Sequence, residues 1–258
     1  MNEFMKKWGL LGKVFGIVIA LLILRFIIDY FGYDVIALNT LTTAFIGAVI
    51  FTIAIIFTGT LTDYKESEKI PSELAASLRS LYMDTRVLPL DDPVIPLVRS
   101  HVRNLIVTIN NGFRQNKWDI KAIGNCIGVV NGDIQTLAKK NVAPPFCVKM
   151  RVELTTIDRI CNRIQTIAET SFIPTAYAIA EISIIAVIFI LLFLKIDPYY
   201  EGLILFAVIS TLIIGILLLI KDMDNPFEVG DGTYADVDLS LLWNLEQEIL
   251  SEEPVNEQ

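Results

Sequence analysis

Two long apolar runs late in the chain set the strongest limit on what it can fold into. Phe172–Leu194 has 23 residues and one charge, Glu181, and Leu203–Ile220 has 18 residues and no charge. At about 1.5 Å rise per residue, a helix formed by either run can cross a hydrocarbon core of roughly 30 Å. Residues 195–202 between them contain turn formers and two tyrosines that suit a membrane surface. These features predict a transmembrane hairpin.

A second apolar block lies near the N-terminus. We expect one span from Val14 to Phe31 and another from Val35 to Leu61, with an aromatic and acidic turn at residues 30–34. Lysines precede the first span but no small-residue cleavage site follows it, which favours an uncleaved span over a secretory signal. The second span has no charge and many threonines, so it is the span best suited to face other helices or water.

The polar stretch between the two blocks is predicted to be a small helical bundle. Its apolar side chains recur at three- and four-residue spacing, which is typical of amphipathic helices. Helices are expected from Pro71, from Val94, from about Trp118 and after a Pro-containing loop, Val142–Phe146. The predicted fold is therefore an all-α membrane protein with four transmembrane helices in two hairpins and a cytoplasmic helical bundle. Its parts are residues 1–61, the bundle 62–171, the second hairpin 172–221 and an acidic tail 222–258.

The distribution of Lys and Arg predicts which side each part occupies. Residues 62–169 contain 15 of them and residues 1–13 contain three, whereas the two short connections contain none and one. Because positively charged segments stay in the cytoplasm, both termini and the bundle are expected there, in a multi-pass protein of the plasma (inner) membrane. Residues 222–258 contain 11 Asp and Glu and no Lys or Arg. This charge excludes nucleic acid as a partner of the tail, which we expect to be solvated, to contact the basic bundle or to hold a cation.

Three charges fall inside the predicted spans. Arg25 and Asp29 lie four residues apart on one helix face, so they can pair locally and lower the cost of placing either in the bilayer. Glu181 is expected near the middle of the third span. Pairing with Arg25 or protonation would explain it structurally, and the alternative is a role in ion passage.

The residues that carry most catalytic and metal chemistry are few. Cys126, Cys147 and Cys161 have no C-x-x-C spacing and are expected to be free thiols in a reducing compartment. His101 is the only histidine, and we expect it to have a packing or surface role. The sequence has no phosphate-binding loop, no serine-hydrolase motif and no zinc-protease motif, and so it does not predict an enzyme.

A short polar signature follows the last span. It consists of Asp222, Asp224, Asn225, Pro226 and Phe227. Together with Ala37–Thr40 before the second span and Leu81–Pro89 after it, this signature and the layout of two hairpins around a bundle resemble the bestrophin superfamily, above all its prokaryotic bestrophin-like members. The resemblance implies a homo-oligomer, a pentamer, that passes chloride and other small anions, with the second span lining a central pore.

The resemblance also suggests where the pore would be narrow. Val49, Ile53 and Phe57 recur at four-residue spacing, which would place three apolar rings on one helix stripe able to gate by dewetting. Such a stripe on a membrane helix more often packs against lipid or another helix. The sequence departs from the channel members here, because it has Phe57-Thr-Gly and Asp63-Tyr-Lys where they have Gly-Phe and Arg-Trp-Trp.

In eukaryotic bestrophins the acidic run after Asn-Pro-Phe takes part in a calcium site. The matching oxygen ligands here would come from Glu228, Asp231, Asp236 and Asp238. Two glycines loosen their spacing and there is no EF-hand pattern, so a solvated acidic turn without a cofactor is the alternative.

Three functions follow from these features. The first is a bestrophin-like anion channel. The second is a non-conducting membrane adaptor or sensor that recruits partners through its bundle and acidic tail. The third is an ion-coupled carrier that uses Glu181 and shows pH-dependent uptake.

Overall fold

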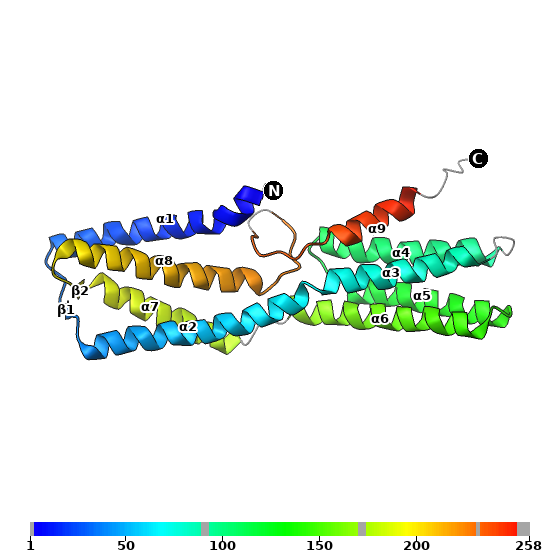
Figure 1. The fold of residues 1–258 in the computed structure, drawn as a ribbon, viewed down its shortest axis with the longest axis horizontal. Helices are drawn as coiled ribbons and strands as arrows, with labels where there is room; N and C mark the ends of the chain where they lie inside the picture. Colours follow the sequence, from blue (N-terminus) through cyan, green and yellow to red (C-terminus); the bar gives the residue numbers. More distant parts are fainter. Residues whose placement is uncertain (1–2, 89–92, 170–173, 231–232, 252–258) are drawn as a thin grey trace. The chain divides into compact units, whose positions relative to one another are not determined.

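The computed structural model describes residues 3–88, 93–169, 174–230 and 233–251, and within them the chain is predominantly helical (Figure 1). It divides into two compact units. The first unit comprises Met1–Tyr64, Ser171–Pro226 and Gly230–Ala235. The second unit comprises Lys65–Thr170, Phe227–Val229 and Asp236–Gln258. The acidic tail thus contributes to both units.

The first unit is built from the apolar blocks of the sequence. Its helices are α1 (Glu3–Tyr30), α2 (Thr40–Ser67), α7 (Pro174–Leu192) and α8 (Tyr199–Met223). Among the described residues, α1, α2 and α8 each contain a stretch long and apolar enough to cross a membrane. The apolar run of α7, Tyr177–Leu192, is shorter. Three of the four predicted spans therefore have the required length, and the fourth is an apolar helix below it.

The two hairpins of this unit meet at their connections. Between α1 and α2, β1 (Ile36–Ala37) pairs in parallel with β2 (Leu194–Lys195), which lies between α7 and α8. In this pairing Ile36 lies opposite Leu194. Both short connections consequently lie at the same end of the unit, as Figure 1 shows at β1 and β2.

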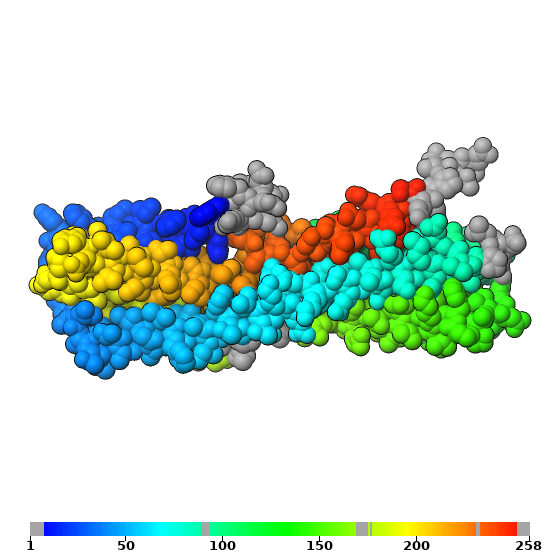
Figure 2. All heavy atoms as spheres, in the orientation of Figure 1, coloured from blue at the N-terminus to red at the C-terminus, as the bar shows by residue number. Residues whose placement is uncertain are grey.

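The helices of the first unit bury apolar side chains among themselves and expose others. One cluster joins all four helices through residues such as Ile28, Ile53, Ile184 and Phe206. The outward faces are also apolar, because α1, α2 and α8 expose large apolar side chains such as Phe26, Phe51 and Ile204. Figure 2 draws the surface of these helices in blue (α1), light blue to cyan (α2) and yellow (α8). A surface this rich in exposed Phe, Ile and Leu suits contact with lipid or with further subunits.

The second unit is a bundle of amphipathic helices. They are α3 (Ile70–Val87), α4 (Val94–Arg114), α5 (Ile120–Lys139), α6 (Pro144–Glu169) and α9 (Ser240–Ser251). Pro71 stands in the first turn of α3, and the Asp119 carboxylate caps α5 by accepting from the N–H groups of Lys121 and Ala122. Both are ordinary helix starts, so local chemistry explains these boundaries.

Two details of the predicted bundle need comment. The expected loop Val142–Phe146 is shorter in the structure, because α6 already begins at Pro144 and proline is tolerated in the first turn of a helix. Most of the expected loop before α4, residues 89–92, and the link from α6 to α7, residues 170–173, lie outside the described residues. The core between these helices contains fully buried side chains such as Leu78, Leu105 and Ile134.

Candidate functional site

The stripe predicted to line a pore faces the chain's own helices. Val49 is 6% exposed and Ile53 is 2% exposed, and both belong to the apolar cluster with α1, α7 and α8. Phe57 is partly buried against the same cluster. A side chain that lines a pore between subunits has to be exposed in a single subunit. The face of α2 that could line such a pore is therefore the opposite, exposed one.

The opposite face of α2 is exposed and free of charge along most of the helix. Phe51 is 68% exposed and Ile55 is 58% exposed. Positions three and four residues apart continue this stripe in both directions. In order, the exposed stripe is Leu41, Ala44, Ala48, Phe51, Ile55, Thr58 and Thr62.

From Thr52 to Thr62, the threonines of α2 donate their hydroxyls to carbonyls of the preceding helical turn. Thr52 donates to the carbonyl of Ala48 at 2.9 Å, and Thr58 donates to that of Ala54 at 2.8 Å. Such bonds to the preceding turn let hydroxyls lie in an apolar environment without another partner. The prediction that these residues are tolerated in a membrane helix for this reason agrees with the geometry.

Arg25 of α1 is a buried charge that binds the C-terminal end of α7. Its residue is 2% exposed, and its guanidinium donates to the carbonyls of Leu191 at 2.9 Å and Leu194 at 3.1 Å. These carbonyls lie at the end of α7, where main-chain acceptors lack helical partners. The Arg25 Nε lies 3.6 Å from the Asp29 carboxylate, so the predicted local pair is confirmed. The guanidinium carbon also lies 5.0 Å from the centre of the Phe206 ring.

Glu181 has a different partner from the one predicted. Its carboxylate pairs with the Lys221 ammonium at 2.5 Å, and its side chain is 41% exposed. Arg25 contacts α7 about ten residues further along, roughly 15 Å away at helical rise, so the proposed pair with Arg25 is wrong. The sequence feature that could have predicted this pair is Lys221, the basic residue in the last turn of α8. In a hairpin of α7 and α8, the end of α8 lies beside the start of α7, where Glu181 is.

The two aspartates of the signature act as hydrogen-bond acceptors. One Asp222 oxygen accepts from the backbone N–H groups of Tyr234 at 2.8 Å and Ala235 at 2.5 Å. Asp224 accepts from the Tyr177 hydroxyl at 2.9 Å. The signature thus fixes the chain that follows α8 and joins the end of α8 to the start of α7. The side-chain oxygen of Asn225 is buried without a described hydrogen-bond partner.

The last signature residue, Phe227, belongs to the second unit. It is buried, and its ring centre lies 6.0 Å from that of Phe113 on α4. Two residues later, Val229 exchanges two hydrogen bonds with the side-chain amide of Asn116, at 2.7 Å and 2.6 Å. Asn116 has a φ of 48°, in the left-handed region that asparagine tolerates. These contacts attach residues 227–229, near the start of the tail, to the end of α4 and the turn that follows it.

The candidate calcium ligands do not gather in the described part of the chain. Asp238 uses both carboxylate oxygens to cap α9, accepting from the N–H and hydroxyl of Ser240 at 2.9 Å each. Asp231 lies outside the described residues, and Glu228 and Asp236 belong to the tail around it. Across residues 3–88, 93–169, 174–230 and 233–251, no group of three His, Cys, Asp or Glu side chains is arranged to hold a metal. The calcium site stays a prediction.

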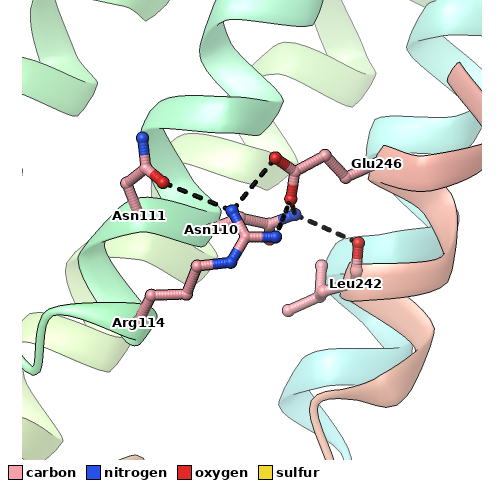
Figure 3. A network of polar contacts seen from close by, with 5 residues as sticks. All are labelled: Asn110, Asn111, Arg114, Leu242 and Glu246. Carbon is pink, nitrogen blue, oxygen red and sulfur yellow. Dashed lines mark hydrogen bonds and ion pairs between the residues drawn. The ribbon is translucent and has the colours of Figure 1, made fainter. Parts of the chain in front are cut away.

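Part of the acidic tail forms a helix, α9, that packs on α3 and α4 through Leu242, Leu245 and Ile249. Figure 3 shows the Glu246 carboxylate of α9 facing Arg114 and Asn110, which both belong to α4. Arg114 donates to its two oxygens at 3.0 Å and 2.5 Å, and Asn110 donates at 2.6 Å. For α9, the expectation that the tail contacts the basic bundle is confirmed.

The histidine and the three cysteines named in the sequence analysis lie within or between the helices of the bundle. The His101 ring nitrogen lies 2.7 Å from an Asp133 oxygen and joins α4 to α5. Cys126, Cys147 and Cys161 are free thiols, as predicted. Burial, and secondarily the charge of Asp158, raises the pKa of the Cys161 thiol from 9.0 to about 12. A thiol with this pKa is protonated at neutral pH and unreactive.

These features define a multi-pass α-helical membrane protein with an attached helical bundle. Solved structures share its fold. A bacterial bestrophin homologue from Klebsiella pneumoniae carrying one substitution matches with a TM-score of 0.77 and 14% identity, over 93% of this chain and 98% of that one. The same homologue solved by zinc phasing matches with a TM-score of 0.77 and 12% identity, over 92% and 98%. A crystal structure described as a membrane protein matches with a TM-score of 0.77 and 14% identity, over 94% and 99%.

Sequence comparison adds nothing to these matches, because neither a family model nor a curated protein matches the chain. The chain has the fold of bacterial bestrophin homologues, and the resemblance inferred from the signature is confirmed at the level of the fold.

Proposed function

We propose that this protein forms a homo-oligomeric channel for small anions in which α2 lines the pore. The observation that carries this proposal is the exposed stripe of α2, which has no charge from Leu41 to Thr62 and belongs to a helix whose other face is buried in its own subunit. The bestrophin-like fold supports the proposal. A ring of such helices, a pentamer by the resemblance, would enclose a neutral pore.

The exposed stripe also replaces the pore residues first predicted. In place of Val49, Ile53 and Phe57, we propose that Phe51 and Ile55 form the narrow apolar part. Rings of large apolar side chains can close a pore to ions by dewetting. Thr58 and Thr62 would then line the wider, polar end of the same stripe.

The proposal includes the arrangement in the membrane. α1, α2, α7 and α8 would span it as two hairpins, and the bundle and both termini would face the cytoplasm of the plasma membrane. The shared position of both short connections at one end of the first unit supports this arrangement. The excess of Lys and Arg in the bundle supports the orientation.

Anion flux from purified protein in liposomes tests the proposal. We expect Phe51→Ala and Ile55→Ala to raise flux severalfold, because each widens and wets the narrow part. Val49→Ala and Ile53→Ala are matched controls, since they remove similar side chains from the buried face and should lower stability by about 1–4 kcal/mol without raising flux per folded oligomer. Absence of flux from protein shown to be inserted and oligomeric would eliminate the channel.

The structure gives less support to the other two functions. A membrane adaptor would offer its acidic tail to partners, but α9 is already engaged by α4. A carrier would need Glu181 in a transport path, but its carboxylate pairs with Lys221.

A further inference from the structure

The exposed stripe of α2 ends in a charge. The stripe passes Thr58 and Thr62 at four-residue spacing, and the next position at this spacing is Glu66, which is also exposed. Glu66 is the first charged residue on the stripe, which has none from Leu41 to Thr62. A carboxylate at this position of every subunit would place a ring of negative charge at the cytoplasmic end of the proposed pore. Such a ring attracts cations and repels anions.

An arginine of α6 neutralises this carboxylate. The guanidinium of Arg163 forms an ion pair with a Glu66 oxygen, and the two side chains are 49% and 55% exposed. Both residues belong to the second unit, so the pair joins the end of α2 to α6 within that unit. An ion pair this exposed contributes little to stability. Its main effect is therefore on the charge at the end of the stripe.

The outward face of α6 adds positive charge beside this pair. Exposed valines, threonines and arginines recur along it at three- and four-residue spacing, in the order Val148, Val152, Thr155, Arg159, Arg163 and Thr166. The two acids within these bounds, Glu153 and Asp158, lie off this face and are less exposed. Arg159 precedes Arg163 by four residues, about 6 Å along the helix axis. The face thus presents two guanidinium groups and no carboxylate of its own.

A guanidinium is suited to select passing anions. It stays charged at physiological pH, presents its N–H donors in one plane and is more weakly hydrated than an ammonium group. Glu66 pairs with one terminal nitrogen of Arg163, and about half of the Arg163 side chain remains exposed. The neighbouring pair of Lys65 and Glu68, at 2.8 Å, adds no net charge. Ions in solution can therefore reach the Arg163 guanidinium beside its paired carboxylate.

We propose that Arg163 determines the charge selectivity of the pore. It cancels Glu66 at the end of the α2 stripe and, together with Arg159, leaves the two faces net positive, so that anions enter and cations are repelled. This inference rests on the proposed function. It assigns the choice between anions and cations to the end of α2 and to α6, and it leaves gating to the apolar part of the stripe at Phe51 and Ile55.

Reversal potentials across planar bilayers that contain the purified oligomer test the proposal. Under a sodium chloride gradient they give the ratio of chloride to sodium permeability. We expect Arg163→Gln to lower this ratio about tenfold, because unpaired Glu66 carboxylates then face the pore. Glu66→Gln should raise the ratio, because it leaves the guanidinium unpaired. The double variant removes one charge of each sign and should return close to the wild type, and Arg163→Lys should lower the ratio less than Arg163→Gln.

The direction of these shifts separates an electrostatic role from a structural one. Arg163→Gln and Glu66→Gln break the same ion pair, so a role in folding alone would move both variants in the same direction. Arg79→Gln is the matched control, because it breaks another exposed Arg–Glu pair of the bundle, with Glu248 at 2.8 Å, and should leave the ratio unchanged. Higher salt on both sides should reduce the differences between variants, because exposed charges are screened.

The outcomes that contradict the proposal can be told apart. Equal ratios in the wild type and Arg163→Gln, or shifts of both single variants in the same direction, would overturn the role of Arg163. A wild type that conducts no ions, although inserted and oligomeric, would overturn the proposed function and this inference together. A wild type that prefers cations, with opposite shifts still present in the two variants, would overturn the anion channel and leave the charge selection at Arg163 and Glu66 standing.

Discussion

The two units satisfy their buried charges in different ways. In the first unit the Arg25 guanidinium is held chiefly by main-chain carbonyls at the end of α7, with Asp29 further away. In the second unit the Glu246 carboxylate is held chiefly by side chains of α4, Arg114 and Asn110. Water can reach the half-exposed Arg114 when its partner is lost, whereas the Arg25 guanidinium is buried, and lipid offers no replacement partner if the first unit spans the membrane as proposed. The same kind of defect should therefore cost more in the first unit than in the second.

The outward faces differ as well. Helices of the bundle carry apolar side chains on one face, so their periodicity identifies the core. Helices of the first unit are apolar on nearly every face, so periodicity does not distinguish the buried stripe from the exposed one. The comparison shows why the bundle helices could be predicted from periodicity, whereas the buried and exposed faces of α2 could not be told apart from the sequence.

The largest effect is expected from Arg25→Met. Two carbonyls lose their donors and the partly buried Asp29 loses its cationic partner, so we expect a loss of about 3–5 kcal/mol, visible as a much lower unfolding temperature in detergent. Lys195→Met is the control, because its ammonium lies 4.0 Å from Asp34 and its side chain is 58% exposed. Equal stability of Arg25→Met and the control would contradict the role assigned to Arg25.

A smaller effect is expected from Glu246→Ala in the bundle. The half-exposed Arg114 then turns to water, whereas the buried Asn110 loses one acceptor and keeps the Leu242 carbonyl. We expect about 1–3 kcal/mol less stability in the α9 contact. Hydrogen exchange of residues 240–251 would measure it. Glu248→Ala, which breaks the exposed pair with Arg79, should cost under about 1 kcal/mol. If Glu246→Ala cost more than Arg25→Met, the contrast between the units would be lost.

The smallest effect concerns pH and Cys161. Burial raises the pKa of this thiol to about 12 in the folded protein, against 9.0 as its ordinary value. Between these values the unfolded chain releases a proton that the folded chain keeps, so stability falls as pH rises above about 9, by roughly 1.4 kcal/mol per unit. Below pH 9 the thiol is protonated in both states and has no effect.

Cys161→Ala isolates this dependence from other groups that titrate at high pH. The stability difference between wild type and Cys161→Ala should shift with pH only above about 9. Rapid alkylation of Cys161 in the folded protein at pH 8 would contradict this expectation, because it would show that the thiol is accessible and ionises easily.

Much of the fold could be predicted from local patterns, and the misses have physical causes. Helix starts such as Pro71 and Asp119 follow from backbone chemistry that the sequence displays. The tail helix α9 was not predicted, because an acidic segment without Lys or Arg is typical of a solvated tail, although Leu242, Leu245 and Ile249 recur at helical spacing. The partners of Arg25 could not be predicted, because main-chain carbonyls have no sequence signal. The hydrogen bond from Tyr177 to Asp224 joins residues 47 apart in the chain, and only the fold brings them together.

The contact of Arg25 with α7 has a consequence for how the protein is made. Its carbonyl partner Leu191 lies 166 residues further along the chain. Because synthesis runs from the N-terminus, in the proposed membrane arrangement the first hairpin would enter the lipid with only Asp29 to neutralise its arginine until α7 is translated. A nascent chain interrupted before α7 would leave the Arg25 guanidinium without its two main-chain acceptors.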